Sequence, residues 1–223
     1  MISIKNIISR TKKFIIFILS ILLLLIFFRT ANSAKINTAE AIATHAEIKY
    51  PSEYNYRQTP NDCGPFNVAA VVRALKKEDA DSKYFAQEIG WRLPNNYTLP
   101  WGLEKQLKKN GISIKTPNLK NLSDQEKIHF LRKELSQGNS AILLIQKDEF
   151  LHYLTILGFD SAANEFYAYD SLHEKNTANP SLTRDDNAEL TGNVTINSEE
   201  ILTLWGGGGV LIFYRWYAIF ASS

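Results

Sequence analysis

Cysteine is nearly absent from this chain, since Cys63 is the only one among 223 residues. A single cysteine excludes an intramolecular disulfide, so packing alone must hold the fold. The chain also lacks the spaced acidic ligands of a calcium loop, and its glycine run at 206–209 lacks the Lys-Ser/Thr of a phosphate-binding loop. We therefore expect neither a metal site nor a phosphate loop.

The chain also has little net charge once residues 1–34 are excluded. Residues 1–34 carry five basic residues and no acidic one, and subtracting these five charges from the chain's +2 leaves −3 for residues 35–223. The remainder has no basic patch interleaved with aromatic residues. This composition argues against nucleic acid as a partner.

Long apolar runs are limited to one near the N-terminus, residues 14–28, which is broken only by Ser20. Basic residues precede it and the small-residue pattern Ala31-x-Ser33 follows it, as in a secretory signal peptide. The run is shorter than the roughly 20 residues of a membrane span, which favours a signal peptide over an anchor. We expect residues 1–34 to be one or the other. In both cases the rest is exported: periplasmic, secreted, or anchored to the outer side of the inner membrane.

Cys63 stands at the start of a predicted helix. Gly64 and Pro65 follow it, and an apolar run continues to Leu75. Proline is tolerated in a first turn because its missing N–H has no intrahelical partner there. The unpaired N–H groups and peptide dipoles at that end favour a thiolate, the nucleophilic form of cysteine. The alternative is a small buried core residue, the commoner fate of a lone cysteine.

A second candidate group lies on two predicted strands. Residues 151–159 and 165–170 are expected to form a hairpin, and counting back from its turn brings His152 and Asp170 to the same end of the pair. A histidine there can take a thiol proton, and a carboxylate can hold its ring and stabilise the imidazolium. The alternative for His152 is a satisfied histidine of the core.

The other segments are predicted to form further helices and strands around these candidate residues. Helices are predicted around 84–89, 103–110 and 123–137, the last with a capping box of Ser123 and Glu126. Short strands are predicted at 112–115 and 141–146, and residues 171–197 are expected to be a polar surface excursion. His45 and His129 are interpreted as solvated. A final strand is predicted at 210–220, with alternate residues on one buried face: Ile212, Tyr214, Trp216, Ala218 and Phe220.

Gln58 stands five positions before Cys63, close enough in a loop for its amide to point to the same place as the Cys63 N–H. Two such donors can bind a developing oxyanion, and losing one costs on the order of 3 kcal/mol in enzymes that use this device. The alternative is a loop glutamine in water.

Taken in chain order, these parts resemble the papain-like cysteine peptidases, and more narrowly the bacteriocin-processing, double-glycine leader peptidase group and its free-standing relatives. The resemblance covers about residues 54–214. It is carried by Gln58, Asp62-Cys63-Gly64-Pro65, Pro100-Trp101-Gly102-Leu103, the stretch from His152 to Asp160, Tyr169-Asp170, and Leu204-Trp205-Gly206.

The resemblance implies an α+β, papain-like fold, with an N-terminal helical half packed on a small antiparallel sheet. It implies Cys63 as nucleophile, His152 as base and then acid, Asp170 as the residue that orients His152, and Gln58 as an oxyanion donor. The family usually places this glutamine six positions before the cysteine rather than five. The best-known members are cytosolic domains fused to peptide-exporting transporters. No cofactor follows from the resemblance.

The domain plan is therefore a signal peptide or anchor at 1–34, a linker at 35–53 and a peptidase domain at 54–223. The first functional hypothesis is an exported thiol hydrolase that cleaves peptide or related amide bonds through an acyl-enzyme, with a peptide or protein as substrate. Membrane contact is expected only through an uncleaved N-terminal segment. The alternatives are a non-catalytic peptide- or protein-binding module on the same fold and a thiol acyltransferase.

Overall fold

The computed structural model describes residues 42–186, 189–209 and 213–223. Its elements are, in chain order, β1 (His45–Glu47), the 3-10 turn η1 (Ser52–Tyr54), α2 (Cys63–Lys76), α3 (Ser82–Glu88), α4 (Pro100–Lys109), β2 (Ser113–Lys115), α5 (Asp124–Ser136), β3 (Ser140–Lys147), β4 (Phe150–Asp160), β5 (Glu165–Tyr169), β6 (Val194–Asn197), α6 (Ser198–Gly207) and β7 (Ala218–Ser222).

Within the described residues, the strands form one seven-stranded antiparallel sheet in the order β2-β7-β3-β4-β5-β6, with β1 paired to the far end of β4. The centre of this sheet is the β3–β4–β5 meander. In its register Ile145 of β3 lies opposite His152 of β4, and Thr155 lies opposite Tyr169 of β5. The predicted hairpin of β4 and β5 is therefore confirmed.

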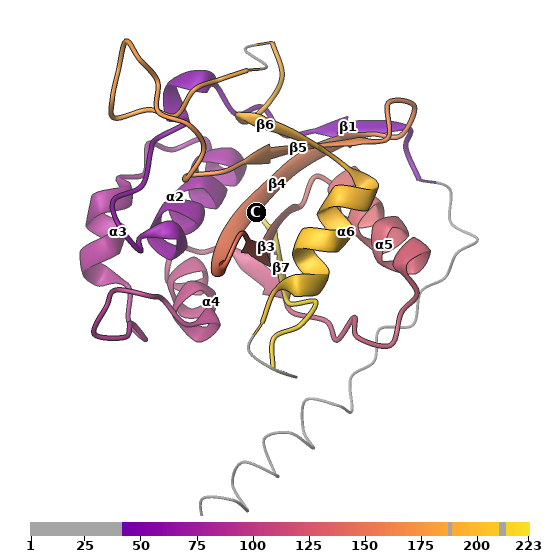
Figure 1. The fold of residues 1–223 in the computed structure, drawn as a ribbon, viewed down its shortest axis with the longest axis horizontal. Helices are drawn as coiled ribbons and strands as arrows, with labels where there is room; N and C mark the ends of the chain where they lie inside the picture. The colour runs from indigo at the N-terminus through magenta and orange to yellow at the C-terminus, as the bar shows by residue number, and fades with distance from the viewer. Residues whose placement is uncertain (1–41, 187–188, 210–212) are drawn as a thin grey trace, which may run out of the picture. The chain divides into compact units, whose positions relative to one another are not determined.

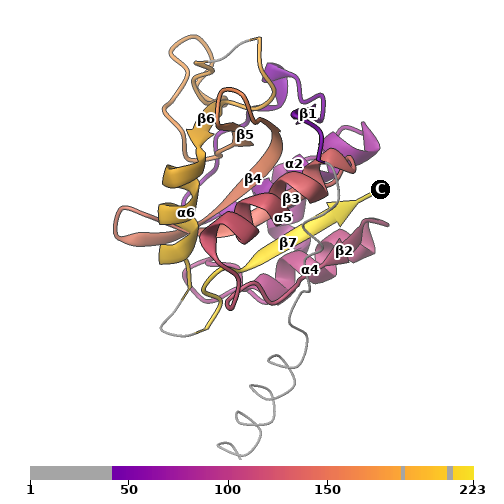
Figure 2. The same cartoon turned by 90° about the vertical axis from the view of Figure 1, so that its right-hand side faces the viewer.

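Helices cover both faces of the sheet. α2, α3 and α4 lie on one face, and α5 and α6 lie on the other (Figure 1). The view in Figure 2 shows α5 and α6 in front of the strands, with β7 and β2 at one edge. An α+β architecture with a helical half packed on an antiparallel sheet is thus confirmed, and the second helical layer completes it.

The core fills the space between α2 and the sheet because α2 is apolar on almost every side. Twelve consecutive residues, Cys63 to Ala74, are buried in it. Such a helix belongs in the interior rather than at the surface. It packs against α3, α4 and the central strands in one cluster that includes Val68, Leu103 and Ile142. The helix that carries Cys63 is consequently the central support of the helical half.

Local signals fixed several other boundaries as predicted. The capping box at the start of α5 is present: the Ser123 hydroxyl accepts from the Glu126 N–H at 3.3 Å, and the Glu126 carboxylate accepts from the Ser123 N–H at 2.7 Å. α4 begins at Pro100, earlier than the predicted start at 103, because the fixed φ of proline suits a first turn. α2 also begins where expected, at Cys63.

The expected linker at 35–53 needs correction from residue 45 onward. β1 pairs with β4, with His45 opposite Asp160, and Tyr50 is only 3% exposed. Tyr50 packs with Tyr169 and Leu157 in a second core cluster. Scattered apolar residues hid this role because they show neither a period of 2 nor one of 3.6.

The final strand is shorter than predicted. β7 begins only at Ala218, because Tyr214 and Trp216 adopt left-handed backbone conformations with φ of 60° and 61°. Such φ values interrupt an extended strand, and the alternation of large residues does not reveal them. Ile212 lies outside the described residues. The polar excursion also ends earlier than expected, in β6, which pairs with β5.

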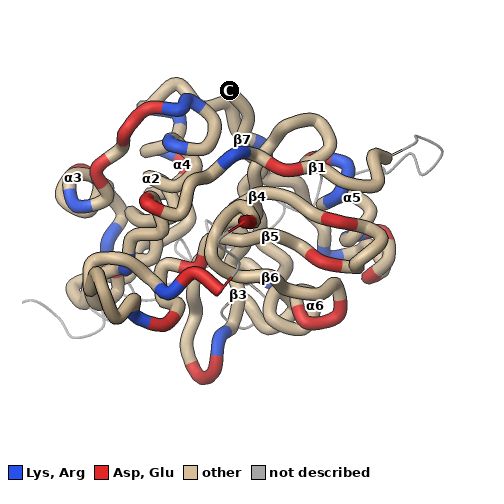
Figure 3. Tube along the Cα trace, turned by 90° about the horizontal axis from the view of Figure 1, so that it is seen from above, with Lys and Arg blue, Asp and Glu red and all other residues tan. Residues whose placement is uncertain are grey.

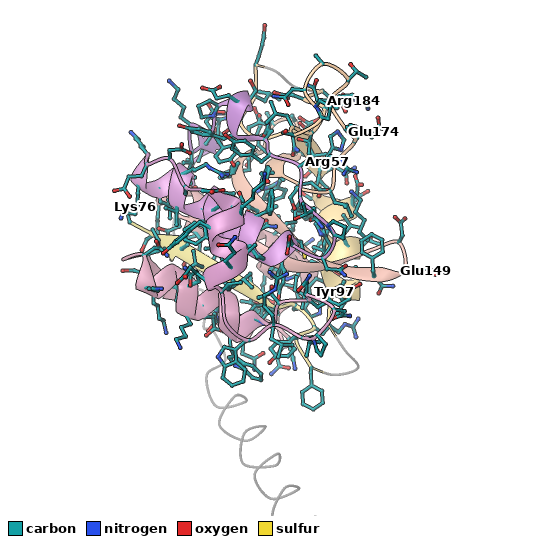
Figure 4. The ribbon with its side chains drawn as sticks, turned by 90° about the vertical axis from the view of Figure 1, so that its left-hand side faces the viewer. Arg57, Lys76, Tyr97, Glu149, Glu174 and Arg184 are labelled. Carbon is teal, nitrogen blue, oxygen red and sulfur yellow. The ribbon has the colours of Figure 1, made fainter. Side chains whose placement is uncertain are left out.

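The loop between β5 and β6 lies over the segment that precedes α2 (Figure 4). The Arg57 N–H donates to the Ser181 carbonyl at 2.8 Å, and within the loop Arg184 forms an ion pair with Glu174. The loop therefore supports the residues just before Cys63.

Figure 3 shows Lys and Arg interspersed with Asp and Glu along the described chain.

None of the helices that the structure describes has both the length and the apolar character needed to cross a bilayer. The apolar run at 14–28, on which the prediction of a signal peptide or anchor rests, lies outside the described residues.

Candidate active site

Cys63 is the first residue of α2 and is 5% exposed. The chain enters the helix through Asp62, which the Arg92 guanidinium contacts at 2.5 Å. The next residue, Gly64, has no side chain, and this allows α2 to approach the start of α4 closely. A Cβ on Gly64 would lie 2.8 Å from the Thr98 Cβ and 3.2 Å from the Leu103 Cδ1. The sulfur is thereby fixed at a helix start by close packing, where first-turn N–H groups favour negative charge.

His152 and Asp170 come together at the end of the β4–β5 pair. His152 Nε2 lies 2.7 Å from Asp170 Oδ1, and the two residues are 1% and 3% exposed. The Cys63 side chain is a second hydrogen-bond partner of the ring. Because Nε2 faces Asp170, the other ring nitrogen, Nδ1, is the one left for the sulfur. The structure thus brings Cys63, His152 and Asp170 into one chain of contacts.

The electrostatics of this pair favour an imidazolium. Burial by itself lowers the His152 pKa, but hydrogen bonds and negative charge from Asp170 and Cys63 outweigh it and raise that pKa from 6.5 to about 9. Burial by itself raises the Asp170 pKa, but hydrogen bonds and positive charge from His152 and Lys147 lower it well below its usual value. Asp170 is therefore ionised at neutral pH.

Asp170 is held by an unusually complete set of partners. Its Oδ1 also accepts from the Leu172 N–H at 2.8 Å, and its Oδ2 pairs with Lys147 Nζ at 2.6 Å. The buried Asn193 amide contacts the Asp170 backbone twice, accepting from its N–H at 2.8 Å and donating to its carbonyl at 2.9 Å. A buried carboxylate needs such partners because unmade bonds are costly there.

A buried amide joins the two halves. Asn67, one turn after Cys63, donates from Nδ2 to the Cys63 carbonyl and to the Tyr153 carbonyl, each at 2.8 Å. Its Oδ1 accepts from the Thr155 hydroxyl at 2.5 Å. Because Tyr153 directly follows His152, these bonds fix the separation of helix and strand. The Asn67 side chain thus sets the distance between the cysteine and the histidine.

Gln58 lies beside the site, before α2. Its backbone N–H donates to the Ser171 carbonyl at 2.9 Å, and its Oε1 accepts from the Ser171 hydroxyl at 2.7 Å. Ser171 directly follows Asp170 and is fully buried. Gln58 is therefore attached to the same turn that places the carboxylate.

Aromatic side chains line the surface near the start of α4. The Trp101 ring lies 5.7 Å from that of Trp91 and 5.8 Å from that of Tyr214. Trp101 and Trp91 are 41% and 58% exposed, so Trp101 is not a buried packing residue. The loop that carries Trp91 also contacts the turn before Cys63, because Asn61 donates to the Asn95 carbonyl at 2.8 Å.

The remaining histidines lie elsewhere. His45 is on β1, and His173 pairs with Asp186 at 3.1 Å in the β5–β6 loop. His129 is on α5 and lines a cavity of about 550 Å³ between α5, α6 and the end of the β4–β5 hairpin, on the opposite face of the sheet from α2. This cavity therefore lies apart from the Cys63 site. Among the described residues no group of His, Cys, Asp and Glu is arranged to hold a metal ion.

The sequence did not predict three residues that contribute to the site: Asn67, Lys147 and Asn193. Asn67 is a polar residue inside an otherwise apolar helix, a signal that a buried polar contact exists. Lys147 ends a central strand and looks like an ordinary solvated residue. Asn193 stands in an Asn-Val-Thr triplet that matches a glycosylation pattern, yet it is fully buried. Only the fold reveals what Lys147 and Asn193 contact.

The fold is that of the papain-like cysteine peptidases, as comparison with solved structures shows. A double glycine motif protease from an AMS/PCAT transporter, solved in complex with the leader peptide, has a TM-score of 0.52 and 15% identity, over 80% of this chain and 95% of that one. The peptidase domain of Streptococcus ComA, a bifunctional ABC transporter involved in a quorum-sensing pathway, has a TM-score of 0.49 and 17% identity, over 76% and 98%.

The family model described as the Peptidase C39-like family matches residues 47–198. The chain belongs to this family. No curated protein matches the sequence. The match begins within β1, in agreement with the place of that strand in the sheet.

Proposed function

We propose that this protein is an exported cysteine peptidase in which Cys63 is the nucleophile, His152 the base and acid, and Asp170 the residue that orients His152. Family and fold support a C39-type cysteine peptidase. The observation that carries the assignment of residues is the buried contact chain from Cys63 through His152 to Asp170, with 2.7 Å between the last two.

In acylation, the Cys63 sulfur attacks the carbonyl carbon of a peptide bond. A C–S bond forms, and the carbonyl π electrons move to oxygen, giving an oxyanion that the Cys63 N–H and the Gln58 amide would bind. When the intermediate collapses, the C–N bond breaks and the imidazolium gives its proton to the leaving amine. Asp170 stays ionised throughout and holds the ring.

In deacylation, His152 takes a proton from water as the water oxygen attacks the thioester carbon. The C–S bond then breaks, and the peptide acid and the free cysteine are restored. The raised His152 pKa of about 9 keeps the ring protonated beside Cys63 before attack, so the proton that the leaving amine takes is already in place. No step needs a cofactor.

The substrate is proposed to be a peptide or protein. The similar protease of the AMS/PCAT transporter was solved with a leader peptide bound. In this chain, the exposed Trp91 and Trp101 lie near the start of α4, and the loop of Trp91 contacts the turn before Cys63 through Asn61. We propose that these two rings bind apolar side chains of the substrate. Export is proposed from the basic and apolar pattern of residues 1–34.

The test is cleavage of a peptide library by the full chain, read by mass spectrometry. Wild type is expected to cleave, Cys63→Ala to show no turnover, and His152→Ala to lose at least about 100-fold. His129→Ala is the matched histidine control and should retain full activity, because His129 lies on the other face of the sheet. Turnover by Cys63→Ala would refute the proposal. Peptide binding without cleavage or covalent adduct in wild type would instead establish a binding module.

A further inference from the structure

The turn from Asp170 to His173 is closed by the His173 N–H, which donates to the Asp170 carbonyl at 3.1 Å. Its first two residues, Asp170 and Ser171, connect the base to the oxyanion donor. Asp170 binds the His152 ring with its side chain, and the next residue binds Gln58 with both backbone and side chain. Asp170 and Ser171 are buried, at 3% and 0% exposure. Any movement of this turn therefore moves both catalytic groups together.

The Ser171 hydroxyl decides which end of the Gln58 amide is available. Its O–H donates to Oε1 at 2.7 Å, so the acceptor end of the amide is occupied. Within the part of the chain that the structure describes, no group accepts a hydrogen bond from Gln58 Nε2. An oxyanion needs a donor, and the fixed orientation leaves the NH₂ end free to provide it.

A backbone hydrogen bond also fixes where Gln58 lies. The Gln58 N–H donates to the Ser171 carbonyl at 2.9 Å, which ties the segment before α2 to the end of β5. Only four residues separate Gln58 from Cys63, one fewer than is usual in the resembling family. Because the shorter connection gives Gln58 fewer ways to reach the site, the hydrogen bonds from Ser171 matter more for placing its amide.

We propose that Ser171 is a positioning residue that orients the Gln58 amide so that its Nε2 donates to the oxyanion. This proposal rests on the proposed peptidase function. It assigns to one turn the placement of both halves of the catalytic apparatus, the general base through Asp170 and the oxyanion donor through Ser171.

The test compares two reactions of Cys63 in the full chain. Peptide hydrolysis forms an oxyanion, whereas attack on 2,2′-dipyridyl disulfide forms a mixed disulfide, releases a pyridinethiolate and develops no oxyanion. In Ser171→Ala, kcat for peptide hydrolysis should fall about 10-fold with KM unchanged, because an oxyanion donor is worth roughly 100-fold or more and here is misoriented rather than removed. The rate with dipyridyl disulfide should stay within about twofold of wild type.

A double mutant separates orientation from general damage. If Ser171 acts through Gln58, then Ser171→Ala should have no further effect on kcat in a Gln58→Ala background. Ser181→Ala is the matched control: its carbonyl still accepts from Arg57, and no hydrogen bond of its hydroxyl is removed at the site. This control should hydrolyse peptides at the wild-type rate.

Three outcomes would overturn the inference alone, with wild type active: undiminished kcat in Ser171→Ala, multiplicative losses in the double mutant, or an equal fall in the disulfide reaction. The last would show that Ser171 supports the fold or the Cys63–His152 pair rather than the amide. A wild type that turns over no peptide would overturn the proposed function, and this inference with it.

Discussion

Cys63 and His152 face each other, yet the helix and the sheet hold them by different means. On the helical side, Cys63 is placed chiefly by close packing: Gly64 lies against Thr98, and α2 is buried on nearly all sides. On the sheet side, His152 and Asp170 are held by hydrogen bonds and charges from Lys147, Asn193 and a backbone N–H. The helical side should therefore be sensitive to volume and the sheet side to polarity and pH.

Among changes that keep the catalytic groups, Gly64→Ala is expected to lower stability and activity the most. The added Cβ would lie 2.8 Å from the Thr98 Cβ and 2.9 Å from its Oγ1. Overpacking typically costs about 1–3 kcal/mol, and contacts this short belong at the upper end, about 3 kcal/mol, against the roughly 1 kcal/mol by which alanine favours a helix over glycine. We expect the free energy of unfolding in urea to fall by about 2 kcal/mol, with activity lost in parallel.

Gly90→Ala is the control for this effect. A Cβ on Gly90 would meet no atom within 4 Å. Its unfolding free energy should stay within about 0.5 kcal/mol of wild type. Equal stability of the two variants would mean that close packing does not place Cys63.

On the sheet side, Asn193→Ala removes an amide that is the partner of the Asp170 N–H, the Asp170 carbonyl and the Thr183 hydroxyl. Leaving a buried N–H unsatisfied costs about 1–3 kcal/mol. We expect a loss of about 2 kcal/mol in urea unfolding and a reduced kcat, because Asp170 loses its anchor. Asn121→Ala changes an exposed asparagine of the same kind of triplet and should alter neither quantity. An equal response in both variants would contradict the assignment.

The sequence predicted the parts whose signals are local. The start of α2, the capping box of α5 and the β4–β5 hairpin follow from Pro65, from Ser123 with Glu126, and from two apolar runs around a polar turn. The hairpin also predicted that His152 and Asp170 share one end. Each of these features depends on residues a few positions apart, for which propensity and periodicity are informative.

What the sequence did not predict depends on distant contacts. β1 joins the sheet through pairing with β4, more than a hundred residues later, and β7 is shortened by left-handed residues at 214 and 216. Asn193 contacts Asp170 across 23 residues, and no local pattern reveals that. The catalytic roles of Cys63, His152, Asp170 and Gln58 stay predictions that the variants above test.

A smaller effect is expected where the sheet side meets solvent. Lys147→Met removes the cation at Asp170 Oδ2, and Lys147 is 32% exposed. Because the folded-state pKa of Asp170 is lowered, its contribution to stability is present above pH about 4 and is lost as the pH falls. The variant should therefore be less stable than wild type by about 1 kcal/mol at pH 7, with the difference vanishing at low pH. In contrast, Lys109→Met breaks the exposed pair with Glu88 and should change unfolding little at either pH.

Cys63 belongs to the helix and yet acts on the charge of His152, so a change at Cys63 tests both sides at once. In Cys63→Ala the ring loses one hydrogen bond and one negative neighbour, so its pKa should fall below about 9, while Asp170 keeps it from collapsing to the value of a buried, unpaired histidine. NMR titration of the imidazole carbons measures this shift, and His152→Gln assigns the signal among the four histidines.

The sign of the accompanying stability change follows from linkage. In wild type the raised His152 pKa stabilises the fold fully below pH 6.5, and this contribution is lost as the pH rises through about 9. In Cys63→Ala the loss should begin at lower pH. An unchanged His152 titration in Cys63→Ala would mean that the sulfur and the ring do not interact, and the two sides would then be independent structures rather than one catalytic pair.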